Sequence, residues 1–525
     1  MTFSISRDVK PRLPAAAQSA QSAHASPPRF SRVPRAARLA AALAGLAAIG
    51  AYLFVALSRL DYPFAVQPLE GNSLVEVHRI LAGQSLYPAP SAGYVPDGYT
   101  PLYFYVAAAA ARVLGVSYLP LRLVSLLSSL ACFALLARLV QRETGSRAAG
   151  AGAAGLFAAT YFVTGTWFDV ARVDSLFLAL SIGGLYAVRQ MRDTRGAVVA
   201  GVLLAAAALT KQTGLAEGVA VFAVLVIGPR RRLAWVAAAA ELAVFGISTL
   251  ALRLTSGGWY TYYVFKQMSE HALDLRNFSW FCTLTLTAMG LAGFAALIAA
   301  RRVPRELLAG CAALAVEGCA TLVHSGGSVN DVLPAYLALA VLAGLALGSD
   351  SSRWGATAAG ALVLAQTVFL LATAHPSQSI PTSADRAAGE RLVAGMRAFG
   401  GDVVFPGDPA LSLQAGMAPA AHPAAVYDVL RATDKAGIAS YRHSAEEAVT
   451  TRRFSAFVSD SPGLPLNGPA SLLKDYHECV QAVPTLFVPA AGSTRLQPVE
   501  LWIPRAGVSC QTAFSIFDGA TAGRS

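Results

Sequence analysis

The chain has 525 residues, of which 55% are hydrophobic and only 14% are charged, and its mean hydropathy is +0.51. This composition excludes a soluble protein of this size and indicates a membrane protein with many spans. The net charge is +11, but the basic residues lie in short clusters between apolar segments, without a soluble basic face or interleaved aromatic residues. The basic clusters therefore indicate how the chain is oriented in the membrane, and we expect no nucleic-acid partner.

Residues 1–36 are rich in Ala, Ser, Pro and Arg and contain no apolar segment. We expect a disordered, basic cytoplasmic leader there and no cleavable signal peptide, since no hydrophobic region precedes the small residues. Eleven apolar segments follow, and we expect each of them to span the membrane. They lie near residues 37–59, 118–139, 147–167, 174–189, 196–210, 212–228, 232–254, 278–300, 306–323, 331–348 and 354–374.

Arginine clusters between these segments indicate the orientation. With eleven spans and a cytoplasmic N-terminus, every dense cluster falls on the cytoplasmic side, as the positive-inside rule expects. A further apolar segment at 101–115 would move all clusters outside if it crossed, and it is shorter than the ~20 residues that a span needs. We therefore expect a juxtamembrane or re-entrant helix there, within a first outer loop at 60–117. The cytoplasmic clusters are Arg138/Arg142/Arg147, Arg189/Arg192/Arg195, Arg230/Arg231/Arg232, Arg301/Arg302/Arg305 and Arg353.

Residues 376–525 follow the last span on the outer side of the membrane. An amphipathic helix is expected at 384–398, and strand-like runs lie at 403–405 and 454–458. Strand-like runs that alternate with helical ones predict a small periplasmic α/β domain, in which we find no catalytic motif.

Some polar residues and two cysteines of this C-terminal region have ordinary explanations. We interpret Asp408, His422, Asp428 and His443 as surface or capping residues. Cys479 and Cys510 could form a disulfide if the region is periplasmic, and the sequence leaves that pairing open.

The first outer loop contains the most specific stretch of the chain. Leu74, Val77 and Leu81 share one helical face, which predicts an amphipathic helix in the membrane interface with Glu70 at its N-terminal end. A carboxylate in that position could act as a general base toward an acceptor hydroxyl. It could equally be an ordinary charge in the first turn of a surface helix.

This loop reads LEGNSLVEVHRILAGQSLY at 69–87 and YTPLYFYVAAAAARVLG at 99–115. Together the two runs resemble the first outer loop of GT-C glycosyltransferases, in particular the protein mannosyltransferase and aminoarabinose transferase families. The resemblance extends more loosely over residues 40–375. It implies a polytopic helical transferase domain at 37–375, a donor sugar on a polyprenyl phosphate, and an acidic residue of the loop that serves as the base or orients the acceptor.

The chain departs from this family pattern at one position. The families usually carry an Asp-Glu pair at the start of the loop, and Leu69 occupies the position of the Asp. Either Glu70 replaces that acid from the next position, or another acid must serve. Tyr99 and Tyr103 are candidates for substrate contact, although tyrosines at headgroup depth are usually interfacial anchors.

A second polar group, Asp169, Arg172 and Asp174, lies at the entrance of the fourth span. Asp174 could be a helix cap that Arg172 neutralises. Alternatively, Arg172 contacts the donor phosphate while Asp169 or Asp174 positions the acceptor or stabilises an oxocarbenium-like transition state. In GT-C enzymes a second acidic residue is common at about this point, and the resemblance therefore favours function.

Lys211 and Gln212 form the turn of a short hairpin at 196–228. Two crossings share these residues at 1.5 Å per residue, so the turn should stop short of the outer surface. A lysine and an amide at that depth are costly unless they face a cavity or a partner. A compact cation suits a phosphate, and we expect Lys211 to bind one.

A fourth polar group lies in the outer turn at 324–331, where His324 and Asn330 are candidates for hydrogen bonds to substrate, with Asp331 beside them. Any short loop with glycines looks similar, so both interpretations remain open. Histidines and cysteines show no metal-ligand spacing, and we find no Walker or dinucleotide motif. We therefore expect no metal and no cofactor.

These observations predict an inverting glycosyltransferase of the bacterial inner membrane, with its site at the periplasmic face. Lys211 and Arg172 would neutralise the phosphate of a polyprenyl-linked donor, and Glu70 or Asp174 would activate a hydroxyl of a periplasmic glycan, lipid or protein. The leaving phosphate needs no strong acid, so charge stabilisation and positioning would dominate. The alternatives are a transporter of a lipid-linked glycan and a non-catalytic membrane subunit.

Overall fold

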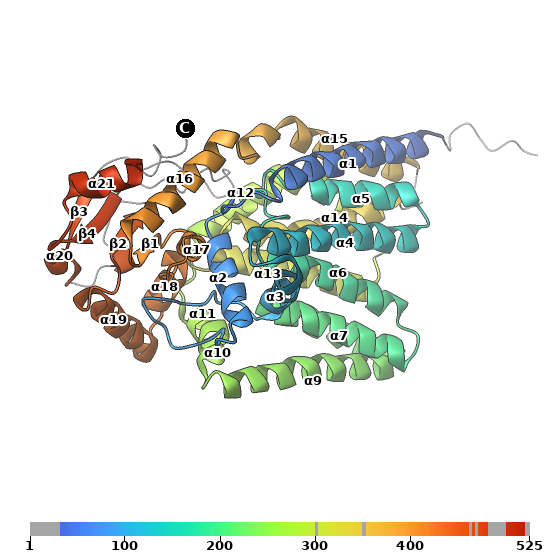
Figure 1. Cartoon of the computed structure of the whole chain (residues 1–525). Coiled ribbons are helices and arrows are strands. Elements are labelled where there is room, and N and C mark those ends of the chain that lie inside the picture. Colours follow the sequence, from blue (N-terminus) through green and yellow to red (C-terminus); the bar gives the residue numbers. More distant parts are fainter. Residues whose placement is uncertain are drawn as a thin grey trace, which may run out of the picture.

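The computed structural model describes residues 32–299, 303–348, 353–460, 465–467, 471–480 and 500–519 of the chain. A bundle of long helices lies beside a smaller part that contains a four-stranded sheet (Figure 1). Most of the expected leader at 1–36 lies outside the described residues, and α1 begins before the expected span. The bundle helices are α1 (Arg32–Arg59), α4 (Tyr118–Thr144), α5 (Arg147–Ala159), α6 (Asp174–Gln190), α7 (Thr194–Thr210), α8 (Leu215–Val226), α9 (Arg231–Thr255), α12 (Arg276–Ala299), α13 (Arg305–Val323), α14 (Leu333–Gly348) and α15 (Arg353–Ala372).

Each of the eleven apolar segments that we expected to span the membrane forms a helix of this bundle. Seven of the described helices are long and apolar enough to cross a membrane, and the chain is a multi-pass membrane protein. The other four, α5 to α8, have 12 to 17 residues each, so the count of eleven spans stays a prediction. The expected segment 147–167 is helical only to Ala159, and the chain then turns, with positive φ angles at Gly165 and Thr166.

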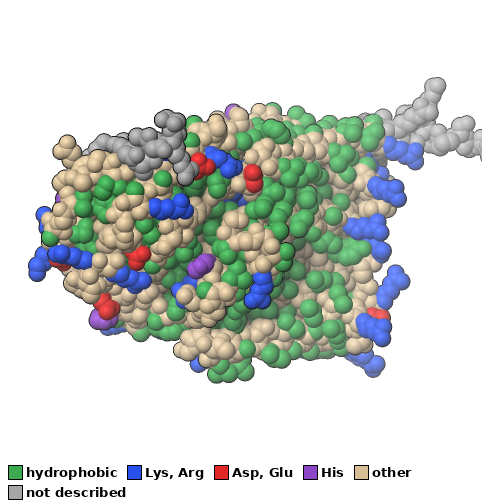
Figure 2. Space-filling view, in the orientation of Figure 1, with side chains coloured by type: hydrophobic (Ala, Val, Ile, Leu, Met, Phe, Trp, Pro, Cys, Tyr) green, Lys and Arg blue, Asp and Glu red, His purple; other side chains and the backbone are tan. Residues whose placement is uncertain are grey.

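Charge is distributed unequally along the bundle. Figure 2 shows basic side chains at the end that lies away from the sheet, and a band of hydrophobic side chains between that end and the other. This asymmetry is typical of a membrane protein whose basic loops share one side. The exposed arginines at this end of the bundle, in the turns or in the helix ends beside them, include Arg142, Arg147, Arg192, Arg195 and Arg231.

Short helices gather at the opposite end of the bundle (Figure 1). They are α2 (Glu70–Leu81), α3 (Leu102–Leu114), α10 (Trp259–Thr261), the π-helix η3 (Tyr262–Gln267), α11 (Met268–Glu270), and the 3-10 turns η2 (Gln212–Gly214) and η5 (Val329–Val332). The expected juxtamembrane helix at 101–115 is α3, whose 13 residues are too few to span a bilayer.

Helix α2 differs from the expected amphipathic surface helix. It begins at Glu70 as expected, but all of its residues from Glu70 to Val77 are buried. The reason is that α3, α4 and α17 (Pro409–Gln414) pack around it. The sequence pattern of α2 could not reveal a cover contributed by a segment more than 300 positions away.

The C-terminal part combines a small sheet with short helices. Its strands are β1 (Val403–Val404), β2 (Ala456–Ser459), β3 (Tyr476–Val480) and β4 (Glu500–Pro504), in the order β1-β2-β4-β3. The first pair is parallel and the other two are antiparallel. The helices besides α17 are η6 (Pro376–Ser379), α16 (Ser383–Phe399), α18 (Pro423–Arg431), α19 (Lys435–Thr450), η7 (Pro465–Asn467), α20 (Leu472–Asp475) and α21 (Cys510–Gly519). The predicted fold class, a mainly α membrane bundle with a small C-terminal α/β part, is confirmed.

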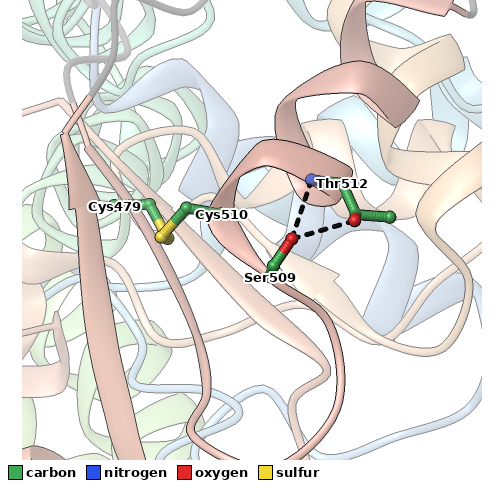
Figure 3. Close-up of a disulfide and its surroundings, with 4 residues drawn as sticks. All are labelled: Cys479, Ser509, Cys510 and Thr512. Atoms are coloured by element: carbon green, nitrogen blue, oxygen red, sulfur yellow. Dashed lines mark hydrogen bonds between the residues drawn. A yellow bond between two sulfur atoms is a disulfide. The ribbon is translucent and has the colours of Figure 1, made fainter.

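A disulfide joins β3 to the first residue of α21 (Figure 3). Cys479 and Cys510 are bonded, with their Cα atoms 5.6 Å apart. Ser509 caps the helix beside them, because its Oγ accepts a hydrogen bond from the backbone N–H of Thr512 at 3.2 Å. The pairing that the sequence left open is therefore present.

The C-terminal part is seated on the bundle through buried polar contacts. Asp408 caps α17 by accepting from the Ala410 N–H, and it also accepts a hydrogen bond of 3.0 Å from the Tyr118 hydroxyl of α4. A side chain at Gly71 of α2 would place its Cβ 2.1 Å from Asp408 Oδ1, so only glycine allows this approach. His422 caps α18. Both residues are caps, as expected, but they are buried and not on the surface.

Candidate active site

A cavity of about 1210 Å³ lies where the short helices of the bundle meet α18 and the start of α19. Its wall combines segments that are far apart in sequence, including the loop at 97–99, the turn between α7 and α8, the π-helix and the loop before η5. Three of the four polar groups singled out in the sequence contribute to it. The predicted site residues that line the cavity are Tyr99, Arg172, Lys211, Gln212, His324 and Asp331.

Lys211 directly follows α7 and is only 3% exposed. Its Nζ lies 3.3 Å from Asp331 Oδ1 and 3.9 Å from Asp174 Oδ1. Asn330 Nδ2 donates to the same Asp174 oxygen at 3.2 Å, so Asp174 and Asn330 stand behind Lys211 and outside the cavity lining. An ammonium group has three N–H donors, and the hydrogen bond to Asp331 uses one of them.

Two further predicted residues hold the cavity wall together. Gln212 Nε2 donates to the backbone oxygens of Gly98 at 2.9 Å and Val264 at 3.1 Å, which ties the α7–α8 turn to the 97–99 loop and to the π-helix. The ring of His324 bonds through Nε2 to the Met268 backbone oxygen at 2.8 Å. Both side chains therefore fix the shape of the wall.

Arg172 forms a buried ion pair with Asp97 on the cavity wall. Arg172 Nη1 donates to Asp97 Oδ2 at 2.5 Å, and Asn72 Nδ2 donates to Asp97 Oδ1 at 2.7 Å. The Arg172 guanidinium also lies over the Tyr99 ring, 5.1 Å from its centroid. Arg172 Nε is buried and has no hydrogen-bond partner within the described residues.

Leu69 lines the cavity, whereas the neighbouring Glu70 does not. Glu70 is fully buried and accepts hydrogen bonds from Arg122 Nε at 2.9 Å and Nη2 at 2.8 Å, and from the N–H groups of Ala171 and Val66, both at 2.7 Å. Burial alone would raise the pKa of the Glu70 carboxyl, but Arg122 and these hydrogen bonds hold it below its ordinary value. This environment fits an ion pair that fixes the Ala171 backbone beside Arg172.

Two other predicted residues also lie away from the cavity. Asp169 accepts from Arg59 Nε and Nη2, both at 2.7 Å, and from the Tyr161 hydroxyl at 2.7 Å. Tyr103 donates to the Leu121 backbone oxygen at 3.1 Å. Neither residue lines the cavity, and each joins helices of the bundle.

Asp97 is the acidic residue that the sequence reading missed. It lies in a Pro-Asp-Gly turn two residues before Tyr99, where an aspartate has an ordinary structural explanation. One signal could have pointed to Asp97. It lies in the same outer loop as Leu69, which occupies the position where the resembled families carry an aspartate. Its partners Asn72 and Arg172 are 25 and 75 positions away.

The C-terminal part supplies another section of the cavity wall, which the sequence did not predict. Tyr427, Asp428, Arg431 and Asp434 line the cavity together with Lys266 of the π-helix. Arg431 pairs with Asp428, and Lys266 pairs with Asp434. Burial raises the pKa of Asp428 to about 6 even though the Arg431 charge opposes this shift.

The chain is similar to known proteins in part of its sequence and in its fold. The family described as dolichyl-phosphate-mannose-protein mannosyltransferase matches residues 96–259, a segment that contains Asp97, Arg172 and Lys211. No curated protein matches the chain.

The structure is similar to ArnT from Cupriavidus metallidurans bound to undecaprenyl phosphate, with a TM-score of 0.57, 11% identity, and coverage of 88% of this chain and 99% of that chain. The apo state of the same protein gives a TM-score of 0.55 at 12% identity, covering 87% and 97% of the two chains. An oligosaccharyltransferase from Archaeoglobus fulgidus has a TM-score of 0.48 at 12% identity, with 79% and 69% coverage. The chain has the GT-C fold, as its sequence resemblance implied.

Proposed function

We propose that this chain, with its GT-C fold, is a membrane glycosyltransferase that moves a sugar from a polyprenyl-phosphate donor to an acceptor hydroxyl. The observation that carries the proposal is the pair of buried cations, Lys211 and Arg172, on the wall of one cavity in a membrane protein. The mannosyltransferase family match spans both residues. The structurally similar ArnT has been seen with undecaprenyl phosphate.

Lys211 and Arg172 would hold the phosphate of the donor. Phosphate oxygens accept charge-assisted hydrogen bonds from ammonium and guanidinium groups, and these are about twice as strong as neutral ones. Lys211 keeps N–H donors beyond the one given to Asp331, and Arg172 Nε has no partner in the described part of the chain. Both cations would also stabilise the charge that develops on the departing phosphate.

Asp97 is the acid that best fits the role of base in the described structure. It lines the same cavity as Leu69, the position where related enzymes carry their acid, whereas neither Glu70 nor Asp174 lines it. The acceptor oxygen would attack the anomeric carbon as the bond from that carbon to the phosphate oxygen breaks. The hydroxyl proton would pass to Asp97, and the polyprenyl phosphate would leave with the bonding electron pair.

The proposed orientation places the cavity at the periplasmic face of the bacterial inner membrane, with a cytoplasmic N-terminus. It is supported by the exposed arginines at the opposite end of the bundle and by the Cys479–Cys510 disulfide, since disulfides persist in oxidising compartments. The acceptor would be a periplasmic glycan, lipid or protein, and membrane lipids would surround the bundle. The proposed reaction contains no step that requires a metal or a cofactor.

The test uses purified full-length protein in detergent with a panel of radiolabelled polyprenyl-phosphate sugars. Wild type is compared with Asp97→Asn and Lys211→Ala, and Lys474→Ala serves as a matched exposed control. Release of one sugar by wild type and the control, and its loss in both site variants, supports the proposal. Binding of donors without any cleavage would favour a transporter or a non-catalytic subunit.

A further inference from the structure

One section of the cavity wall is built jointly by the C-terminal part and the π-helix, and nothing in the proposed phosphate chemistry uses it. We define this section, the roof, as Trp259, Tyr262, Lys266, Tyr427, Asp428 and Arg431. The roof residues belong to α10, the π-helix and α18, and α10 and α18 lie at the end of the bundle that meets the C-terminal part (Figure 1).

Each of the two cations in the roof forms an ion pair with a carboxylate. Arg431 pairs with Asp428 three positions before it, and Lys266 pairs with Asp434, the cap of α19. Arg431 Nη1 also donates to Ser325 Oγ at 3.2 Å. The guanidinium lies against Gly326, where an added Cβ would come within 2.3 Å of it and where φ is +93°, so a glycine is needed there.

Backbone groups also join the C-terminal part to the bundle beside the roof. Glu270 Oε2 accepts from the N–H groups of Thr433 and Asp434, both at 2.9 Å. His271 Nε2 bonds to the Asp428 backbone oxygen at 2.9 Å. The part of the roof that α18 contributes is thus held to the bundle at α11 and at the Ser325 turn. The side chains of Tyr427, Asp428 and Arg431 therefore keep a defined position over the cavity.

Aromatic faces accompany these polar groups. The Arg431 guanidinium lies 5.0 Å from the Tyr427 ring centroid, and that tyrosine is 57% exposed. Trp259 and Tyr262 pack edge to face with centroids 5.1 Å apart. The Tyr262 hydroxyl and Arg431 Nε are buried without a hydrogen-bond partner within the described residues. π-Helices such as the one that carries Tyr262 and Lys266 are frequent at functional sites.

We propose that the roof is the acceptor subsite and that it binds a neutral carbohydrate, an inference that rests on the proposed transferase function. A sugar ring offers an apolar C–H face to an aromatic ring and hydroxyls that both donate and accept, which matches aromatic faces beside carboxylates and a guanidinium. Arg431 and Lys266 are each paired with a carboxylate, and the hydroxyls of a neutral sugar can hydrogen-bond to both members of such a pair without separating them. The paired charges beside aromatic faces therefore favour an uncharged, hydroxyl-rich ligand.

Binding is the first test, because it does not depend on turnover. Full-length protein in detergent is titrated with a pool of neutral tri- and tetrasaccharides, a size-matched pool of uronic-acid oligosaccharides and a serine-rich peptide, and contacts are detected by saturation-transfer NMR. Neutral saccharides are expected to bind, and Tyr427→Ala and Arg431→Ala should weaken that binding at least tenfold. Exposed Arg442 of α19 does not line the cavity, so Arg442→Ala should bind like wild type.

Kinetics then separate this inference from the proposed function. With a cleavable donor, the two roof variants should raise the KM for a neutral saccharide acceptor at least tenfold, and much more than the KM for the donor. Tyr427→Ala is the decisive variant, since the Tyr427 side chain forms no hydrogen bond with the described part of the chain and folding is least at risk. Preference for acidic saccharides or peptide, or unchanged saccharide binding in Tyr427→Ala, would overturn the inference. Donor that is never cleaved, with saccharide binding that still depends on Tyr427, would instead reject the transferase function.

Discussion

Asp97 and Arg172 form a buried ion pair on the cavity wall, with Arg172 Nη1 donating to Asp97 Oδ2 at 2.5 Å. The pair joins the first long loop of the chain to the entrance of α6. It brings a carboxylate to the cavity that Leu69 also lines, and it leaves the Nε of Arg172 without a partner in the described structure. The pair thereby holds the proposed base and one of the two proposed phosphate-binding cations in contact.

The first prediction concerns Asp97→Asn. Loss of a general base costs typically 10²- to 10⁴-fold in rate, so we expect sugar transfer to fall at least a hundredfold while polyprenyl-phosphate binding persists. Transfer rates and binding are measured side by side, and a thermal melt shows that the variant is folded despite the stability lost with the buried ion pair to Arg172. Asp61→Asn, at an aspartate whose side chain is 78% exposed, should stay within about twofold of wild type. A folded Asp97→Asn protein with nearly full activity would contradict the role of Asp97.

The second prediction separates Glu70 from Asp97. Glu70→Gln leaves the buried Arg122 without its carboxylate, and breaking a buried ion pair costs about 3–5 kcal/mol. We therefore expect a clear fall in thermal stability in detergent, whereas Glu390→Gln at an exposed position of α16 should melt like wild type. A Glu70→Gln protein that is stable yet inactive would instead support the base that the sequence suggested.

The third prediction concerns donor affinity. Hydrogen bonds to charged groups contribute about 1.5–3 kcal/mol, which corresponds to at least a tenfold change in Kd. Lys211→Ala should therefore weaken undecaprenyl-phosphate binding at least tenfold, measured by titration of detergent-solubilised protein. Lys474→Ala removes an exposed lysine of α20 and should leave the Kd unchanged. Equal affinities for both variants would remove Lys211 from the phosphate site.

Features that depend on local sequence were predictable. Hydropathy located all eleven apolar helices, and the length of the 196–228 hairpin located the buried turn at Lys211. Arg172 and Asp331 were singled out because they lie in polar turns at the outer ends of apolar segments. These arguments use only neighbouring residues, and the structure brings Arg172, Lys211 and Asp331 to one cavity.

Features that depend on distant partners were not predictable. Glu70 looked like a free carboxylate because its partner Arg122 is 52 positions away. Asp97 looked like a turn residue because Arg172 is 75 positions away. The C-terminal part contains no catalytic motif, yet its Arg431 lines the cavity and donates a hydrogen bond to Ser325, which lies 106 positions earlier. Each error reflects a tertiary contact that no periodicity or local motif encodes.

The fourth prediction uses the pH dependence of stability at the seat of the C-terminal part. Burial raises the pKa of Asp408 to about 7 from 3.8, although the hydrogen bond from Tyr118 opposes the shift. The folded state thus holds the Asp408 proton more tightly than the unfolded state does. The resulting stabilisation is complete below about pH 4 and is lost as the pH rises through 7, at about 1.4 kcal/mol per unit of pKa difference.

Asp408→Asn should remove this contribution, because the amide oxygen can still accept from Tyr118 and Ala410 but the side chain no longer titrates. Melting temperatures measured from pH 4 to pH 8.5 should show wild type losing stability relative to Asp408→Asn between pH 4 and 7, with a constant difference above about pH 8. Asp61→Asn, at the exposed aspartate, should run parallel to wild type throughout. Parallel curves for wild type and Asp408→Asn would show that Asp408 ionises normally, and the C-terminal part would then be seated without a buried proton.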